Sequence, residues 1–304
     1  SLRLALKHML IGFIVNPAAG RGRAARLWTK IEGQLLEKGC SFRCYPSPGP
    51  GALQQLASQA AAECDAVAAV GGDGTLHQVL NGVIGTGVPL GIVPAGSGND
   101  FCRSLGIHRD AVKAALGLYQ AEEQRFDCGW LDQEAFINVA GVGFDAAVCA
   151  AQERRWRFLP GSISYVAAVL DALVHLRPSS ITLKLDDTVL ERQALLVAIA
   201  NGQTFGGGMV IAPEARPDDG LLDVILVGPL SRSAFMRFFP LVYRGQHVNH
   251  PAVEVWRARR IEITASPAMP CQAEGEAMGY TPTLVQVEPG VIPFLIPRPS
   301  PGPP

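Results

Sequence analysis

Short apolar runs alternate with amphipathic segments over roughly the first 120 residues of the chain. Four runs have the length and composition of buried strands: Leu10–Val15, Ser41–Tyr45, Ala66–Val70 and Leu90–Val93. Between and after them, apolar positions recur at spacings of three and four, which predicts helices over Arg23–Lys38, Ala52–Ala62, Leu76–Val83 and Ala111–Tyr119. Such alternation is typical of an α/β domain with a parallel sheet and right-handed crossovers.

The hydrophobic pattern changes from about Phe126 onward. Turn residues now separate short apolar runs: Ala135–Ala140, Ile181–Leu185, Leu195–Ala200, Leu222–Val227, Val253–Trp256, Ile261–Ala265 and Leu284–Val287. This spacing favours an antiparallel β-sandwich or barrel, of which the sandwich is the predicted form. Two predicted helices interrupt it, Ser162–Leu176 and Ser231–Tyr243.

These patterns predict two domains. The α/β domain covers residues 1–125, with residues 290–297 returning to it, and the β-rich domain covers residues 126–289. Residues 298–304 are mostly proline and are expected to form a loose tail.

The amino-acid composition argues against several classes of protein. The 304 residues are 48% hydrophobic and carry a net charge of −1, so no overall positive field attracts nucleic acid. The seven cysteines include no C-x-x-C pair, which argues against a disulfide framework and favours the cytoplasm. The apolar stretch Met9–Val15 is too short for a signal peptide, and no run reaches the 18 to 20 apolar residues of a membrane span.

Three glycine-containing turns follow strands of the predicted parallel sheet: Asn16–Gly22, Gly71–Thr75 and Pro94–Asp100. Glycine permits positive φ and lets backbone N–H groups approach an anion. Each turn also opens a helix, whose N-terminal dipole favours phosphate. One such turn has an equally good geometric explanation, but three after successive strands predict a Rossmann-like nucleotide-binding domain.

The side chains of these turns suit phosphoryl transfer. Thr75 and Ser97 offer hydroxyls to phosphate oxygens, and Asp73 and Asp100 offer carboxylates to Mg²⁺ or to a hydroxyl proton. The structural alternative for Asp73 is a turn aspartate that bonds its own backbone. No G-x-x-x-x-G-K-[ST] loop is present, and Asp110 is best explained as the cap of the helix that follows it.

At these residues the sequence resembles the diacylglycerol kinase catalytic-domain family, in particular the bacterial YegS- and BmrU-like lipid kinases, which are related to sphingosine and ceramide kinases. The motifs that carry the resemblance are Asn16-Pro17 with Gly20-Arg21-Gly22, Gly71-Gly72-Asp73-Gly74-Thr75, Gly96-Ser97-Gly98-Asn99-Asp100-Phe101, Asn138 with Gly141-Val142-Gly143-Phe144-Asp145, and Asp218-Asp219-Gly220-Leu221-Leu222-Asp223. They follow the family order over nearly the whole chain.

The resemblance implies the two-domain architecture shared by NAD kinases and diacylglycerol kinases, with ATP and a lipid substrate meeting between the domains. The implied ATP-binding residues are Asn16, Gly20, Gly22, Ser47, Gly71, Gly72, Asp73, Gly74, Thr75, Leu76, His77, Gln78, Ser97, Gly98 and Asn99. The implied catalytic residues are Glu276, Asp73 and Glu274, and the implied substrate-side residues are Asp100, Asp127 and Asp145.

The same resemblance implies a structural metal loop over Pro213–Leu221. There the backbone carbonyls of Arg216 and Leu221 and the carboxylate of Asp219 would bind Mg²⁺ or Ca²⁺, hard cations that prefer oxygen. Taken from the residues alone, Asp218-Asp219-Gly220 is a hairpin turn.

Two residues depart from the family pattern. Glu274 stands where family members usually have aspartate, before Gly275-Glu276, and Gln78 replaces a frequent glutamate. The proton acceptor is either Glu276 or Asp73. Asp145 resembles the head-group contact of sphingosine kinases, with a helix N-cap as the equally good alternative.

The resulting hypothesis is an ATP-dependent kinase of diacylglycerol or a related lipid that meets its substrate peripherally at the membrane. The segment Arg154–Leu159 mixes cations with aromatic residues as a head-group surface does, although a solvated helix face is the more frequent explanation. The alternatives are a catalytically silent nucleotide- or lipid-binding module, an NAD kinase, and a structural protein without a ligand. The sequence specifies neither the lipid nor the oligomeric state.

Overall fold

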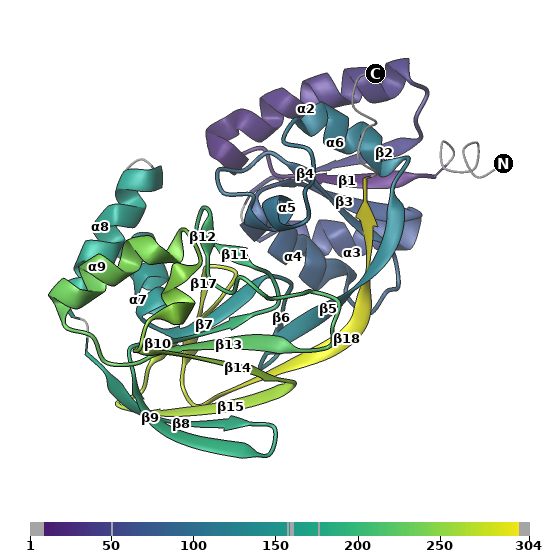
Figure 1. Cartoon of the computed structure of the whole chain (residues 1–304). Helices are drawn as coiled ribbons and strands as arrows, with labels where there is room; N and C mark the ends of the chain where they lie inside the picture. Colours follow the sequence, from purple (N-terminus) through teal and green to yellow (C-terminus); the bar gives the residue numbers. More distant parts are fainter. Residues whose placement is uncertain (1–8, 50, 157, 159–160, 176, 298–304) are drawn as a thin grey trace, which may run out of the picture. The chain divides into compact units, whose positions relative to one another are not determined.

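The computed structural model describes residues 9–49, 51–156, 158, 161–175 and 177–297. The chain divides into two compact units (Figure 1). The first runs to Phe126 and resumes at Gly290, and the second comprises Asp127–Pro289. Two strands contain the division points, β5 (Glu122–Leu131) and β18 (Thr283–Ile296).

The first unit alternates strands and helices as its apolar pattern predicts. Its further elements are β1 (Ile11–Val15), α2 (Ala19–Glu37), β2 (Phe42–Pro46), α3 (Leu53–Glu63), β3 (Ala66–Gly71), α4 (Asp73–Val83), β4 (Leu90–Pro94), α5 (Asp100–Ser104) and α6 (Ala111–Leu118). The sheet order is β2-β1-β3-β4-β18, all parallel, with β18 joining β4 through the pair Phe294 and Leu90. Regular helical geometry in α2 begins only after Gly20, Arg21 and Gly22, which have φ of 57°, 57° and 80°.

Helices cover both faces of this sheet (Figure 1). One face packs on α2 and α6, with Phe13 of β1 against Trp28 of α2 at a ring separation of 5.3 Å. On the other face Gly12 lies against α3, where a Cβ would come within 3.0 Å of the Ala60 Cβ. Because both faces are covered, the strands are apolar throughout, as in other parallel sheets. Asp110 caps α6, its Oδ1 accepting from the N–H groups of Val112 (2.9 Å) and Lys113 (3.1 Å), as predicted.

The second unit is built mainly from antiparallel strands. Its further elements are β6 (Glu134–Phe136), β7 (Val139–Gly143), α7 (Phe144–Ala151), the π-helical turn η1 (Gln152–Trp156), α8 (Gly161–Val174), β8 (Ser179–Leu185), β9 (Thr188–Ala194), β10 (Leu196–Ala200), β11 (Thr204–Phe205), β12 (Met209–Val210), β13 (Leu222–Val227), α9 (Arg232–Val242), the 3₁₀ turn η2 (Gln246–Asn249), β14 (Val253–Ala258), β15 (Arg260–Ser266), β16 (Pro270–Ala273) and β17 (Glu276–Tyr280).

Two antiparallel sheets enclose the core of this unit. One has the order β14-β13-β10-β7-β16-β17, and the other joins β15, β8 and β9 to the first half of β18. Buried aliphatic side chains of both sheets, such as Val142, Ile199 and Ile263, form one cluster between them. A second cluster joins α7, α8 and α9 through Phe144, Val169 and Phe235. The helices therefore cover an end of the sandwich that the sheets alone leave apolar.

The predicted fold class, an α/β domain followed by an antiparallel β domain, is confirmed. The prediction of one strand over Ala135–Ala140 is wrong, because Ile137 and Asn138 interrupt it and separate β6 from β7. The periodicity also missed the strands β5, β9, β11, β12, β16 and β17. The predicted tail at 298–304 lies outside the described residues. Among the described helices, none combines the length and apolar composition that a bilayer crossing requires.

Candidate active site

The three glycine turns of the first unit pack backbone against backbone at the carboxyl ends of β1, β3 and β4. A Cβ on Gly96 would overlap the Cα of Gly72 and lie 2.8 Å from its nitrogen. A Cβ on Gly20, which has φ of 57°, would lie 2.5 Å from the carbonyl oxygen of Ala95. These positions therefore exclude any side chain. The sequence prediction that the turns share one edge of the sheet holds within this unit.

Polar side chains fix the shape of this edge. The Nδ2 of Asn16 donates to the Thr75 Oγ1 over 3.0 Å, which joins the first turn to the second. The Oδ1 of Asp73 accepts from the N–H of Phe101 over 3.1 Å, which joins the second turn to the third. Asn99, with φ of 54°, closes the third turn through two bonds to the backbone of Gly96, of 3.1 and 3.0 Å. The three turns are thus one connected backbone surface.

The predicted ATP-binding residues differ in what they expose. Gly74 and Ser97 are exposed, whereas Leu76 and His77 are each 1% exposed and face the interior. Ser47 is buried, and its hydroxyl donates to the Gly49 carbonyl over 2.7 Å. For Leu76 and His77, any contact with a nucleotide therefore falls to the backbone.

Asp100 lies in the same unit, in the first turn of α5. Asp100 is buried, and its Oδ1 accepts from the Arg103 Nη1 over 2.7 Å. Gly98 lies between the two acidic residues, because a Cβ there would be 3.0 Å from the Asp73 Oδ2 and 3.5 Å from the Asp100 Oδ2. The structure thus brings both carboxylates to the glycine surface.

In the second unit, Asp127 anchors the loop that was predicted to bind a metal. Its Oδ2 accepts from the N–H of Gly220 and its own N–H donates to the carbonyl of Pro217, both over 2.7 Å. The side chain is 2% exposed. The predicted substrate-side role of Asp127 is not tested by this geometry, but its carboxylate has a clear structural task.

The predicted metal set lies on that loop. Asp219 Oδ1 accepts from the N–H of Leu221 over 3.1 Å, and its Oδ2 lies 3.9 Å from the Arg257 Nη1. Together with the carbonyls of Arg216 and Leu221, this is an all-oxygen donor set, which fits Mg²⁺ or Ca²⁺. Over the described ranges, no three or more His, Cys, Asp or Glu side chains are grouped so as to hold a metal ion. The predicted set has only one such side chain.

Glu274 occupies the two-residue turn between β16 and β17. Ala273 pairs with Glu276, and Glu274 and Gly275 have φ of 51° and 90°, as in a type I′ hairpin. The Glu274 Oε1 accepts from the N–H groups of Ile137 (2.9 Å) and Asn138 (2.6 Å). Its carboxylate therefore satisfies the two backbone donors at which the predicted strand breaks, and it orients the turn that presents Glu276 at the start of β17.

The hydrogen bonds of the Glu274 carboxylate can be compared with the backbone strain at the same residue. A residue other than glycine in the left-handed region costs about 1–2 kcal/mol. The two backbone bonds share one carboxylate oxygen and together contribute about 2–3 kcal/mol. The carboxylate bonds thus outweigh the strain at Glu274, and we call this arrangement the Glu274 clamp.

Sequence reasoning missed Asn201, which is 0% exposed. Its Nδ2 donates to the carbonyls of Asp127 (3.1 Å) and Ile137 (2.8 Å), and its N–H donates to the carbonyl of Asn138 (2.8 Å). Asn201 therefore links the Glu274 clamp to the loop held by Asp127. The only signal in the sequence was a polar Asn-Gly pair directly after a buried strand.

Asp145 is the second residue of α7, whose N-cap is Gly143, so the N-cap alternative is wrong. Its Oδ2 accepts from the Gln272 Nε2 over 3.0 Å, and the Gln272 Oε1 accepts from the N–H of Gly275 over 2.8 Å. Burial raises the pKa of the Asp145 carboxyl to about 6, against the lowering effect of the Gln272 bond. Gln272 thus connects Asp145 to the turn of the Glu274 clamp.

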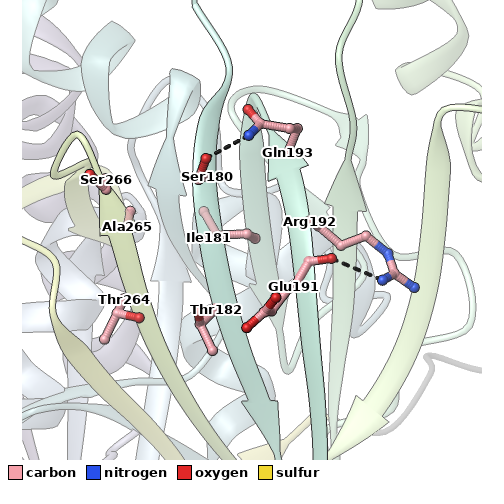
Figure 2. Close-up of a pocket in the computed structure, with 9 residues that line it drawn as sticks. All are labelled: Ser180, Ile181, Thr182, Glu191, Arg192, Gln193, Thr264, Ala265 and Ser266. Atoms are coloured by element: carbon pink, nitrogen blue, oxygen red, sulfur yellow. Dashed lines mark hydrogen bonds between the residues drawn. The ribbon is translucent and has the colours of Figure 1, made fainter.

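A cavity of about 520 Å³ lies away from all these residues, on the outer face of β8, β9 and β15. Figure 2 shows the residues that line it, most of them polar, with the Gln193 side chain bonded to the Ser180 hydroxyl over 2.5 Å. Along β8 these exposed positions alternate with buried ones, so the hollow is the solvent face of a half-buried sheet. No residue predicted for ATP, substrate or metal lines it.

Comparison with known protein families shows to which family this two-domain chain belongs. The diacylglycerol kinase catalytic domain matches residues 11–131, and the YegS C-terminal NAD kinase beta sandwich-like domain matches residues 138–296. The chain belongs to the diacylglycerol kinase family. The resemblance drawn from the sequence motifs is thereby confirmed.

Individual relatives agree over nearly their full lengths. A protein of Mycobacterium tuberculosis named diacylglycerol kinase is 31% identical over 293 residues, 94% of each chain. One of Bacillus subtilis with the same name is 28% identical, over 88% of this chain and 90% of its own. A crystal structure of a diacylglycerol kinase from Bacillus anthracis shares the fold with a TM-score of 0.75, at 24% identity and over 97% of this chain and 98% of that one. The family is one of lipid kinases, so the protein is an enzyme that phosphorylates a lipid alcohol.

Proposed function

We propose that this enzyme transfers the γ-phosphoryl group of ATP to the free hydroxyl of diacylglycerol. The observation that carries the proposal is the connected backbone surface of three glycine turns at the carboxyl ends of β1, β3 and β4. Closely packed turns that open helices offer N–H groups and positive dipole ends to a polyphosphate. The choice of diacylglycerol is supported by the names of the full-length relatives.

In this proposal the triphosphate lies on the surface formed by Gly20, Gly72 and Gly96. Gly74 and Ser97 are exposed beside it and contact the phosphates, whereas Thr75 acts mainly by holding Asn16. Catalysis of phosphoryl transfer depends mostly on positioning and charge stabilisation. A rigid backbone surface can hold the phosphates in a fixed position and donate hydrogen bonds to them.

The transfer is an in-line displacement. The lipid hydroxyl oxygen forms a bond to the γ-phosphorus while the bond to the β,γ-bridging oxygen breaks, and ADP leaves with that electron pair. The hydroxyl proton passes to a carboxylate, either Glu276 or Asp73. In this proposal the Glu274 clamp orients Glu276, because the Glu274 Oε1 holds the turn before Glu276 through two backbone N–H groups.

The carboxylates of Asp73 and Asp100 are the residues that would hold Mg²⁺ with ATP, and the loop of Arg216, Asp219 and Leu221 would hold a structural Mg²⁺ or Ca²⁺. Bound with ATP, the cation supplies positive charge to the phosphate oxygens. Asp127 acts on the protein side of this arrangement by fixing the loop through Gly220.

The test is transfer of labelled γ-phosphate from ATP to a panel of lipids containing diacylglycerol, a sphingoid base, ceramide and phosphatidylglycerol. We expect diacylglycerol to be labelled fastest and Glu276→Gln to lower kcat at least about 100-fold with ATP affinity retained. The matched control is Glu191→Gln, the same charge change on the exposed face of β9, which leaves kcat within about twofold. ATP binding without transfer to any lipid contradicts the proposal and favours a silent binding module. Intact transfer in Glu276→Gln leaves Asp73 as the base, to be checked with Asp73→Asn.

A further inference from the structure

The segment Pro213–Asp223, which we call the acidic segment, leads into β13 and carries four carboxylates and one arginine. Two of its carboxylates, Glu214 and Asp218, are exposed to solvent. The other two are sheltered, since the side chains of Asp219 and Asp223 are 19% and 4% exposed. Sheltered carboxylates require a positive partner, because the water that would solvate them is largely excluded. The acidic segment therefore needs a cation in order to fold.

Arg257 supplies this positive charge from a neighbouring strand. It lies in β14 directly opposite Asp223 of β13, and its Nε donates to the Asp223 Oδ1 over 3.1 Å. Its Nη1 lies 3.9 Å from the Asp219 Oδ2, within ion-pair distance. The two sheltered carboxylates of the acidic segment thus face one guanidinium group.

The same guanidinium also holds the start of the acidic segment. Its Nη2 donates to the carbonyl of Glu214 over 3.0 Å. Arg257 therefore contacts the start, the middle and the end of the segment, at residues 214, 219 and 223. A planar guanidinium with five N–H donors can bind several oxygens at once. A bound Ca²⁺ likewise gathers carboxylate and carbonyl oxygens around one positive charge.

The other polar contacts of the acidic segment are consistent with this role. The Asp219 Oδ1 accepts from the N–H of Leu221 over 3.1 Å, so each of its two oxygens faces a donor group of the chain itself. Arg216 is the one basic residue of the segment, and its Nε donates to the Oδ1 of the exposed Asp218 over 3.3 Å. The charge of Arg216 is thus directed to an exposed carboxylate and leaves the sheltered pair to Arg257.

We propose that Arg257 is the internal cation of the acidic segment and keeps it folded whether or not a divalent cation is bound. A divalent cation held by the carbonyls of Arg216 and Leu221 then adds to this support without being required for it. The consequence reaches Asp127, whose Oδ2 accepts from the N–H of Gly220 within the segment. Arg257 is thus a positioning residue for Asp127.

The experiment measures hydrogen exchange of the peptide that covers residues 213–223 in the full chain, by mass spectrometry. Each protein is stripped of divalent cations, checked by elemental analysis, and measured with EDTA or with excess Ca²⁺. In the parent we expect exchange rates that agree within about twofold between the two conditions. Arg257→Gln should exchange at least about tenfold faster in EDTA. Ca²⁺ should bring its rate to within about threefold of the parent, because a bound cation then supplies the missing charge.

The chain offers a matched control in Arg192 of β9. Its Nε and Nη2 donate to the two carboxylate oxygens of Glu254 in β14, over 2.7 and 3.3 Å. Its side chain is 39% exposed, as is that of Arg257. Arg192→Gln removes the same charge from a similar pair, but its hydrogen-bond partners lie outside the acidic segment. We expect exchange of the 213–223 peptide within about twofold of the parent in both conditions.

A second variant, Arg257→Lys, keeps the positive charge and loses the planar group. Its exchange in EDTA should lie between those of the parent and Arg257→Gln. If Arg257→Gln does not fold, Arg257→Lys and the parent with and without Ca²⁺ decide the question.

Exchange of the parent peptide at least about tenfold faster in EDTA than in Ca²⁺ overturns the inference, because a divalent cation then folds the segment. So does exchange of Arg257→Gln in EDTA that is as slow as in the parent. Fast exchange in Arg257→Gln that Ca²⁺ does not reduce also contradicts it, since Arg257 is then an ordinary structural contact. The measurement contains neither ATP nor a lipid, so its outcome is independent of the proposed function.

Discussion

The glycine turns of the first unit and the Glu274 clamp of the second present two ways of building a rigid turn. In the first unit, backbone packs directly on backbone, as Gly72 and Gly96 do, and no side chain fits between. In the second, a buried carboxylate reaches back over 136 residues to bind the N–H of Asn138. Backbone contact leaves peptide groups facing outward for a ligand, whereas the side-chain clamp uses its polar groups internally. Backbone packing therefore suits a binding surface, and the Glu274 clamp suits the positioning of a neighbouring side chain such as Glu276.

The largest expected effect comes from adding a methyl group where two glycine turns pack against each other. Gly96→Ala places a methyl group against the Gly72 backbone, so one of the turns must move. We expect ATP affinity, measured by calorimetry, to fall at least about 100-fold, which corresponds to about 2.7 kcal/mol. Gly33→Ala is the control, since a Cβ there meets nothing within 4 Å, and it stabilises α2 by about 0.5–1 kcal/mol. Unchanged ATP affinity in Gly96→Ala would show that the backbone contact is unimportant for binding.

The clamp is tested by removing its acceptor. Glu274→Ala leaves the N–H groups of Ile137 and Asn138 buried without their partner and should lower the free energy of unfolding of the second unit by about 2–3 kcal/mol. Glu274→Gln retains a side-chain oxygen and should lose less than half as much. Hydrogen exchange at the two amides provides a reading independent of catalysis. Slow exchange at both amides in the alanine variant is incompatible with the clamp.

A smaller effect is expected at Asp145, which joins the clamp through Gln272. Because burial raises the pKa of Asp145 to about 6 in the folded chain, the folded state binds more protons than the unfolded one between about pH 4 and pH 6. The free energy of unfolding therefore falls as pH rises through this window, by on the order of 2 kcal/mol. Asp145→Asn removes this contribution. Urea unfolding at pH 4.5 and 7.5 measures it, and an identical pH difference in the two proteins would assign the slope to other groups.

The sequence predicted the packed glycine turns more completely than it predicted the Glu274 clamp. Glycines after successive strands have few other uses, so the pattern at Gly72 and Gly96 could be interpreted without a structure. The partners of Glu274 are peptide N–H groups, which every residue except proline carries, so nothing at Ile137 or Asn138 marks them as its targets. The same reason explains the failure to predict the break between β6 and β7. The exposure of aliphatic residues of α8 such as Val166 and Leu170 also escaped prediction, because periodicity locates apolar positions but does not tell which face is covered.

The path of the chain through the first unit also affects its biogenesis. Residues 290–296 supply the strand beside β4, and the side chain of Phe294 contacts Phe101 and Phe126 at ring separations of 5.5 and 5.6 Å. During translation this strand leaves the ribosome only after all of residues 127–289 have been made, a delay on the order of ten to thirty seconds. Until then the nascent first unit has an open sheet edge at β4. During translation the β-rich second unit is therefore synthesised in full before the sheet of the first unit can be completed.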